Sequence, residues 1–207
     1  MGRRMIFKPS ITKEELELLP AFGFQGKIFL IESPEQYKMA EKVLFKSRVL
    51  GFDTESKAAF KKGVKNQPAL IQLATEDSAF LFRIHKLGIP DFVLKLLSST
   101  RITKVGVALS QDVKELQQIA PFKPANFIDL QPYSGKLGII DNGLKKLAGI
   151  VLELNISKGQ RLSNWNAEVL SENQLEYAAT DAWVTRAIYI KLKQYENELG
   201  RTDTKAG

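Results

Sequence analysis

Short apolar runs, each bounded by turn-forming residues, recur through the first two thirds of the chain. Runs of this kind are typical of β-strands, whereas apolar residues spaced three and four positions apart are typical of helices. The run at 102–109 is almost entirely apolar, which indicates a strand buried on both faces. The pattern predicts strands at residues 27–31, 49–55, 68–74, 79–84, 102–109 and 126–130.

Capping residues mark where the intervening helices begin. Ser33 precedes Pro34 and Gln36, and Ser171 precedes Gln174 at the same spacing as Ser33 to Gln36. Serine and glutamine at this spacing form a capping box, in which each side chain binds the backbone amide of the other residue. Helices are predicted near residues 12–20, 34–46, 90–97, 110–120, 144–149 and 171–199.

These elements predict an α/β fold in which helices flank a central mixed sheet. The sheet is expected to have five strands, which are those predicted from residue 49 onward. The first three of these strands are joined locally and predict an antiparallel meander, whereas the later strands alternate with helices. No Pro/Gly-rich linker divides the chain. We expect one domain at 27–199, preceded by an N-terminal arm and short helix at 1–26 and followed by a disordered tail at 200–207.

Two carboxylates end the predicted strand at 49–55. Asp53 and Glu55 are two residues apart, so on a strand they point to the same face with Cα atoms roughly 6–7 Å apart. Two neighbouring anions beside an apolar core repel each other and lose hydration unless a cation lies between them. A divalent metal ion satisfies this requirement. A strand end whose acids are merely solvated is the alternative.

Three further polar residues are candidates for the same chemistry. Asp112 lies in the first turn of a helix that follows a buried strand, where it either serves a ligand site or simply interacts with the helix dipole. Tyr177 and Asp181 are four residues apart on the last helix, so they share one face. They form either part of a buried site or a solvated polar strip.

Composition narrows the chemistry. The chain has no cysteine and a single histidine, which excludes thiolate chemistry, iron–sulfur clusters and multi-histidine metal sites. Any metal must be held by Asp and Glu oxygens, which favours Mg²⁺ or Mn²⁺. The formal net charge of +7 favours a polyanionic partner, nucleic acid first, although a merely basic soluble protein has the same composition.

The location of the chain is predicted from what the sequence lacks. No apolar run approaches the roughly 18–20 residues of a membrane span. Arg3 and Arg4 near the start are not followed by the apolar segment of a signal peptide. We therefore expect a cytoplasmic protein without a membrane partner, and the sequence leaves a protein partner or a homo-oligomer open.

The candidate residues occur in stretches that resemble the three motifs of the DEDD 3′–5′ exonucleases, in the tyrosine subclass. These stretches are Phe52-Asp53-Thr54-Glu55, Val105-Gly106-Val107-Ala108 with Asp112, and Tyr177-Ala178-Ala179-Thr180-Asp181. Residues 67–73 and 158–165 further resemble the Werner-syndrome exonuclease domain and RNase D. The resemblance covers roughly residues 27–199.

This resemblance implies an RNase H-like fold and two divalent ions, Mg²⁺ or Mn²⁺, with Asp53 bridging both. It implies that Glu55 and Asp181 complete the shell of the first ion, that Asp112 holds the second, and that Tyr177 positions the attacking water. The implied activity is removal of nucleoside 5′-monophosphates from nucleic acid with a free 3′ end. DNA is the favoured substrate, with RNase D-like trimming of RNA and a non-catalytic nucleic-acid-binding module as alternatives.

Basic residues in two loops and on one helix are candidates for substrate binding. The Werner-type domain has a tryptophan where this chain has Lys114, so a stacking contact is not expected there. A solvated basic surface is the alternative for the whole set. The candidates are Lys57, Lys61, Lys62, Lys65, Lys114, Lys158 and Arg161.

Overall fold

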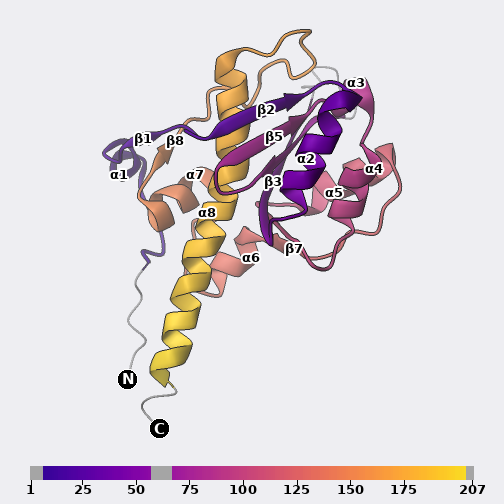
Figure 1. The fold of residues 1–207 in the computed structure, drawn as a ribbon. Coiled ribbons are helices and arrows are strands. Elements are labelled where there is room, and N and C mark those ends of the chain that lie inside the picture. The colour runs from indigo at the N-terminus through magenta and orange to yellow at the C-terminus, as the bar shows by residue number, and fades with distance from the viewer. Residues whose placement is uncertain (1–6, 57–66, 204–207) are drawn as a thin grey trace.

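The computed structural model describes residues 7–56 and 67–203, and a six-stranded mixed sheet forms their centre (Figure 1). The strands lie in the order β2-β5-β4-β3-β6-β7. The antiparallel β3-β4-β5 meander is confirmed, and the other neighbouring pairs are parallel. The bounds are β2 Lys27–Ile31, β3 Val49–Ser56, β4 Pro68–Ala74, β5 Ser78–Phe82, β6 Thr103–Gly106 and β7 Phe127–Asp129.

The predicted count of five strands is wrong because β2 joins the same sheet. It pairs in parallel with β5 along its whole length, from Lys27 opposite Ser78 to Ile31 opposite Phe82. The apolar pattern locates this strand, but its partner is about fifty residues away, and a periodicity carries no information on which distant strand it will pair with.

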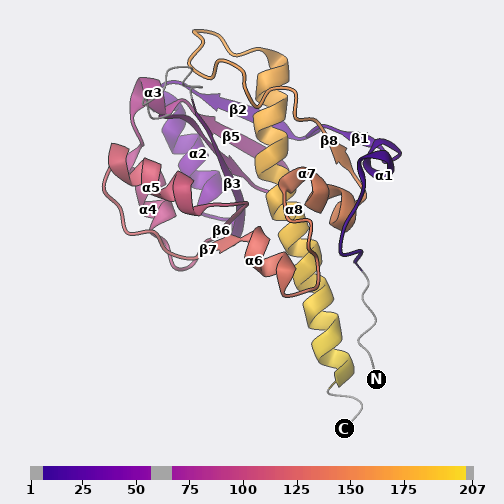
Figure 2. The ribbon, with the colours of Figure 1, turned by 180° about the vertical axis from the view of Figure 1, so that it is seen from behind.

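One face of the sheet is covered by the long helix α8, Glu172–Asp203, which packs against β2 to β6 (Figure 2). A Cβ added to Gly51 would lie 1.8 Å from the carbonyl oxygen of Ala182, so only glycine lets helix and strand approach so closely. The Ser171–Gln174 capping box is confirmed, with Ser171 N to Gln174 Oε1 at 3.0 Å and Gln174 N to Ser171 Oγ at 3.3 Å.

The helix also continues beyond the predicted end near Leu199. The predicted disordered tail is therefore wrong for residues 200–203, which are helical, while 204–207 lie outside the described residues.

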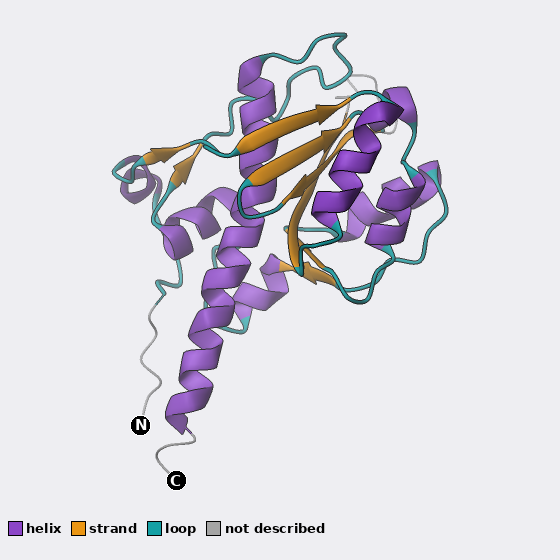
Figure 3. Cartoon of the chain, in the orientation of Figure 1, coloured by secondary structure: helices purple, strands orange, loops and turns teal. Residues whose placement is uncertain are grey.

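The opposite face is covered by α2 (Tyr37–Leu44), α4 (Asp91–Leu97) and α5 (Ser110–Ile119), as Figure 3 shows. Leu50 and Phe52 of β3 point into this core and are fully buried. Side chains alternate along a strand, so Gly51, Asp53 and Glu55 face α8 instead. The alternation of β3 thus places an apolar core on one side and two acids on the other.

Smaller elements surround this core. Two short strands, β1 and β8, form a parallel sheet of their own that the sequence pattern did not predict. The helix predicted to stop at Gly149 instead continues as a π-helix to Leu152. These elements are α1 Lys13–Glu17, β1 Ala21–Phe22, η1 Pro34–Gln36, α3 Ile84–Leu87, α6 Leu130–Gly135, α7 Leu144–Leu147, η2 Ala148–Leu152 and β8 Asn155–Ile156.

The N-terminal segment is packed against the domain. The short helix predicted there is present, and Thr12 and Glu15 form its capping box. Phe7 and Ile11 are buried together with residues of α8 and η2, so the predicted N-terminal arm does not extend away from the domain at residues 7–11. Residues 1–6 lie outside the described residues. Within the described ranges, no helix combines the length and apolarity needed to cross a membrane.

Candidate active site

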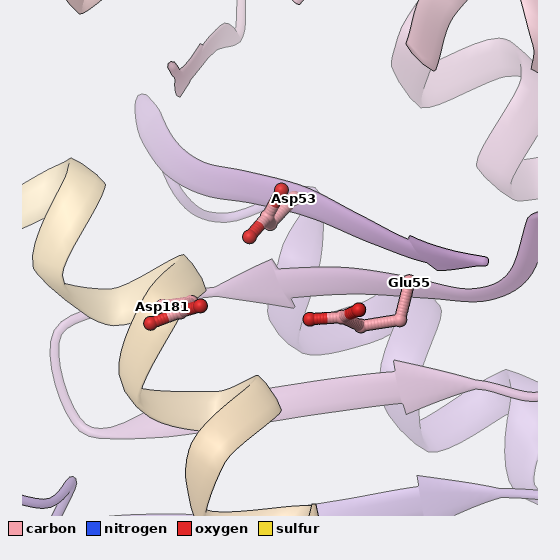
Figure 4. Close-up of side chains that lie close together, drawn as sticks. All are labelled: Asp53, Glu55 and Asp181. Atoms are coloured by element: carbon pink, nitrogen blue, oxygen red, sulfur yellow. The ribbon is translucent and has the colours of Figure 1, made fainter. Parts of the chain in front are cut away.

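Three of the four predicted acids converge between β3 and α8. Asp53 and Glu55 come from the strand and Asp181 from the helix, and one carboxylate oxygen of each lies within 4.8 Å of those of the other two. Figure 4 shows the three side chains facing a common space. The strand alternation and the close approach of α8 at Gly51 together produce this arrangement.

The three acids are crowded and poorly hydrated. Glu55 and Asp181 are 8% and 7% exposed, and Asp53 is half-buried. Burial, followed by repulsion from the neighbouring carboxylates, raises the pKa of Glu55 to about 9 and that of Asp53 well above its usual range. Burial also raises the pKa of Asp181 to about 7. The folded protein therefore resists full ionisation of this cluster unless a cation is present.

Tyr177 lies one helical turn before Asp181, close enough for its hydroxyl to interact with that carboxylate. The tyrosine is 8% exposed, and its ring packs near that of Trp165. Burial and the charge of Asp181 raise the pKa of the phenol above its usual value. The hydroxyl consequently keeps its proton at neutral pH and acts as a hydrogen-bond donor.

Asp112, the fourth predicted acid, is not part of this three-acid cluster. It lies in the first turn of α5, and its carboxylate accepts a hydrogen bond from the hydroxyl of Thr54. Thr54 alternates with Asp53 and Glu55 along β3, so it points away from α8 and toward α5. Burial raises the pKa of Asp112, and the hydrogen bond from Thr54 opposes that rise. Asp112 is thus held by a side chain on its own side of β3.

The turn that leads into α5 is held by Asp129 at the end of β7. Its carboxylate accepts hydrogen bonds from the backbone amides of Ala108 at 3.1 Å, Leu109 at 3.0 Å and Gln131 at 2.9 Å. Ala108 has a φ of 57°, a left-handed conformation that non-glycine residues rarely adopt. Asp129 therefore stabilises the strained turn that positions Asp112. A lone aspartate after a strand offers no sequence signal for this role.

The three acids and Tyr177 line a cleft of about 390 Å³. Two predicted substrate-binding residues, Lys158 and Arg161, also line it, as does Lys145, which the sequence did not single out. Lys114 is exposed on α5 and is not among the residues that line the cleft. The other four predicted residues, Lys57, Lys61, Lys62 and Lys65, lie outside the described residues.

The loop carrying Lys158 and Arg161 is anchored from two sides. Trp165 is fully buried, as expected for a packing residue. The guanidinium of Arg83, also fully buried, donates hydrogen bonds to the carbonyl oxygens of Ala167 and Glu168. The sequence did not predict that Arg83 anchors this loop. Arg83 directly follows β5, and the loop that it contacts lies about eighty residues later in the chain.

The donor set of the cluster fits a divalent cation. Three carboxylates supply hard oxygen ligands from two rigid elements, and their raised pKa values reflect burial and, for Asp53 and Glu55, mutual repulsion, both of which a bound cation would relieve. Magnesium and manganese are the ions that favour such ligands.

Comparison with known proteins identifies the family. Residues 28–195 match a family of 3′–5′ exonucleases. The chain belongs to this family. It is a 3′–5′ exonuclease of the DEDD type with the RNase H-like fold predicted from the sequence.

Individual relatives agree with the family assignment. The chain is 32% identical over 197 residues to the bifunctional 3′–5′ exonuclease/ATP-dependent helicase WRN of Mus musculus, covering 89% of this chain and 14% of that protein. It is 30% identical over 169 residues to DNA polymerase I of Aquifex aeolicus, covering 82% and 28%. The chain thus spans less than half of the length of these relatives.

Among solved structures, RNase D of Escherichia coli has the same fold. It superposes with a TM-score of 0.73 at 24% identity, covering 84% of this chain and 46% of that one.

Proposed function

We propose that this exonuclease is metal-dependent and releases nucleoside 5′-monophosphates one at a time from the 3′ end of DNA. The single observation that carries the metal dependence is the convergence of three carboxylates from β3 and α8, whose oxygens lie within 4.8 Å of one another and two of which are buried. The similarity to a DNA polymerase over most of this chain favours DNA over RNA.

Two divalent ions, Mg²⁺ or Mn²⁺, are proposed to bind at the cluster. Asp53, Glu55 and Asp181 would hold the first ion and Asp112 the second, with Asp53 shared between them. When bound, such a pair supplies an activated water and stabilises the negative charge that develops on the scissile phosphate. The carboxylates themselves contribute a fixed anionic frame whose geometry is set by a strand and a helix.

Tyr177 is proposed to orient the attacking water, which would place the chain in the tyrosine subclass. Its hydroxyl lines the cleft and is protonated, so it donates a hydrogen bond and is not suited to remove a proton. Lys145, Lys158 and Arg161 line the same cleft and are proposed to contact the phosphates of the bound strand. The cytoplasmic location stays a prediction.

The test is a cleavage assay on a 5′-labelled DNA strand with Mg²⁺ or Mn²⁺. Wild-type protein should shorten the strand stepwise, EDTA should stop the reaction, and Asp53→Ala and Asp181→Ala should each abolish it. Asp91→Ala is the matched control, because Asp91 is an exposed acid at the start of α4. Persistent cleavage by both active-site variants would sink the proposal.

Matched RNA and DNA strands, single-stranded and duplex, separate the alternatives. Faster cleavage of RNA would assign the protein to RNA trimming. Salt-sensitive binding of a strand without any metal-dependent cleavage would make it a binding module.

A further inference from the structure

A second groove lies at the end of the sheet opposite to the carboxylates. It is formed by the loops that follow α2 and α4 and lead into β3 and β6, and its volume is about 600 Å³. These loops are held side by side, because the backbone amide of Thr103 donates a 2.9 Å hydrogen bond to the carbonyl of Arg48. Arg48 is five residues before Asp53 on β3, which corresponds to roughly 16 Å along the strand.

The groove is lined by four exposed cations, Lys46, Arg48, Lys95 and Arg101, and by no carboxylate. Within the described ranges, none of the four is in an ion pair. Arg186, which lies nearby, differs from them because it pairs with Glu76 at 3.5 Å. Like charges gathered in one concave surface raise its positive potential and attract anions.

Helix dipoles explain only part of this arrangement. Lys95 is in the last turn of α4, where a cation interacts favourably with the helix C-terminus. That effect falls off within the last turn. Lys46 and Arg48 follow the end of α2 at Leu44, and Arg101 follows the end of α4 at Leu97, so none of these three belongs to the last turn of a helix.

The groove also presents an aromatic ring. Phe45 lines it and is 42% exposed, although large apolar side chains are usually buried. Aromatic rings interleaved with cations in a groove are the typical surface for single-stranded nucleic acid, since phosphates contact the cations and bases stack on the rings.

We propose that this groove is a second binding site for single-stranded nucleic acid, which contacts a substrate strand away from the 3′ end that is cleaved. This inference rests on the proposed function in one respect, which is that the strand bound in the groove is the substrate of the exonuclease. A strand must be long enough to reach from the cleft to the opposite end of the sheet. Long strands should therefore bind more tightly than short ones.

The test measures binding and not cleavage. Fluorescence anisotropy of a labelled DNA strand of about 20 nucleotides, longer than the roughly 4–16 nucleotides that one binding domain covers, is followed in EDTA at several salt concentrations. The test variant is Arg48→Glu/Arg101→Glu. The matched control is Lys136→Glu/Lys191→Glu, which changes the charge equally at exposed lysines outside the groove.

The groove variant should bind at least about tenfold more weakly. Loss of two phosphate contacts should also reduce the slope of log affinity against log salt by about 1.4. The control should keep most of the affinity. Equal affinity and slope for the groove variant and wild type, or an equal loss in the control, would overturn the proposal. If the charge reversals unfold the protein, as a thermal melt would show, Arg48→Gln/Arg101→Gln replaces them with the same expectations.

Cleavage of a dinucleotide by wild-type protein separates this inference from the proposed function, because a dinucleotide is too short to reach the groove. If the protein cleaves neither the dinucleotide nor a long strand with metal present, the proposed function is contradicted and the binding result still stands.

Discussion

The acids on the two faces of β3 are in different environments. On the α8 side, Asp53, Glu55 and Asp181 crowd together, and the hydroxyl of Tyr177 lies beside Asp181. On the α5 side, Asp112 stands apart and receives the hydroxyl of Thr54. The cluster therefore resists full ionisation, whereas Asp112 is already partnered. The comparison teaches that the three-acid candidate metal site is built into the fold, whereas the second ion position that we propose at Asp112 depends on a hydrogen bond from one side chain.

Of the changes that test this comparison, removing the hydroxyl of Tyr177 on the α8 side should have the largest effect on activity. Tyr177→Phe should lower kcat about a hundredfold, since one positioned hydrogen-bond donor in an active site contributes on the order of 10²–10³-fold. Stabilisation of the protein by Mn²⁺ in a thermal melt should persist, because the carboxylates remain. Tyr189→Phe on the same helix, which alters a ring packed against Tyr133 outside the cleft, should keep full activity. An unchanged kcat for Tyr177→Phe would contradict the proposed role.

Removing the hydroxyl on the other side should have a smaller effect. Thr54→Val leaves the carboxylate of Asp112 without its donor, which disfavours the ionised form that binds a cation. Half-maximal activity should require about tenfold more Mn²⁺, a factor in line with the roughly 1.5–3 kcal/mol of a hydrogen bond to a charged group. Metal-dependence curves provide the measurement. Thr54→Ser should retain the wild-type curve, and an equal shift in both variants would argue against the hydroxyl.

The smallest effect is a change of stability with pH. The folded-state pKa of Glu55 is about 9 and that of Asp181 about 7, both above their ordinary values, so the folded protein binds more protons than the unfolded chain between about pH 4 and pH 9. The stability of metal-free protein should therefore fall as pH rises through this range. Between about pH 6 and pH 8 the Tm should drop by about 5 °C.

Saturating Mg²⁺ should raise the Tm and remove most of this dependence, because the ion stabilises the ionised carboxylates. Sodium chloride at equal ionic strength should neither raise the Tm to the same extent nor remove its dependence on pH. A Tm that rises with pH in metal-free protein would show that the cluster is not electrostatically strained.

Much of this arrangement follows from local periodicity. Because side chains alternate along β3, Asp53 and Glu55 lie on the same face of the strand. Because Tyr177 and Asp181 are four residues apart, they lie on the same face of helix α8. The capping box at Ser171 sets where α8 begins. These features depend only on neighbours in the chain, so the residues of the three-acid cluster were predictable before the fold was known.

The long-range contacts were decided by the tertiary structure alone. That β2 joins the sheet as a sixth strand, that Asp112 meets Thr54 and that Asp129 supports a strained turn at Ala108 all depend on which distant segments pack together. The basic groove likewise arises only because β3 and β6 pair and bring two loops side by side.

Strand β3 illustrates both sides of this division. The sequence determined that its two acids lie on one face and would repel each other without a cation. The close packing of α8 at Gly51 decided that a third acid joins them, because a helix can approach a strand so closely only where no side chain intervenes.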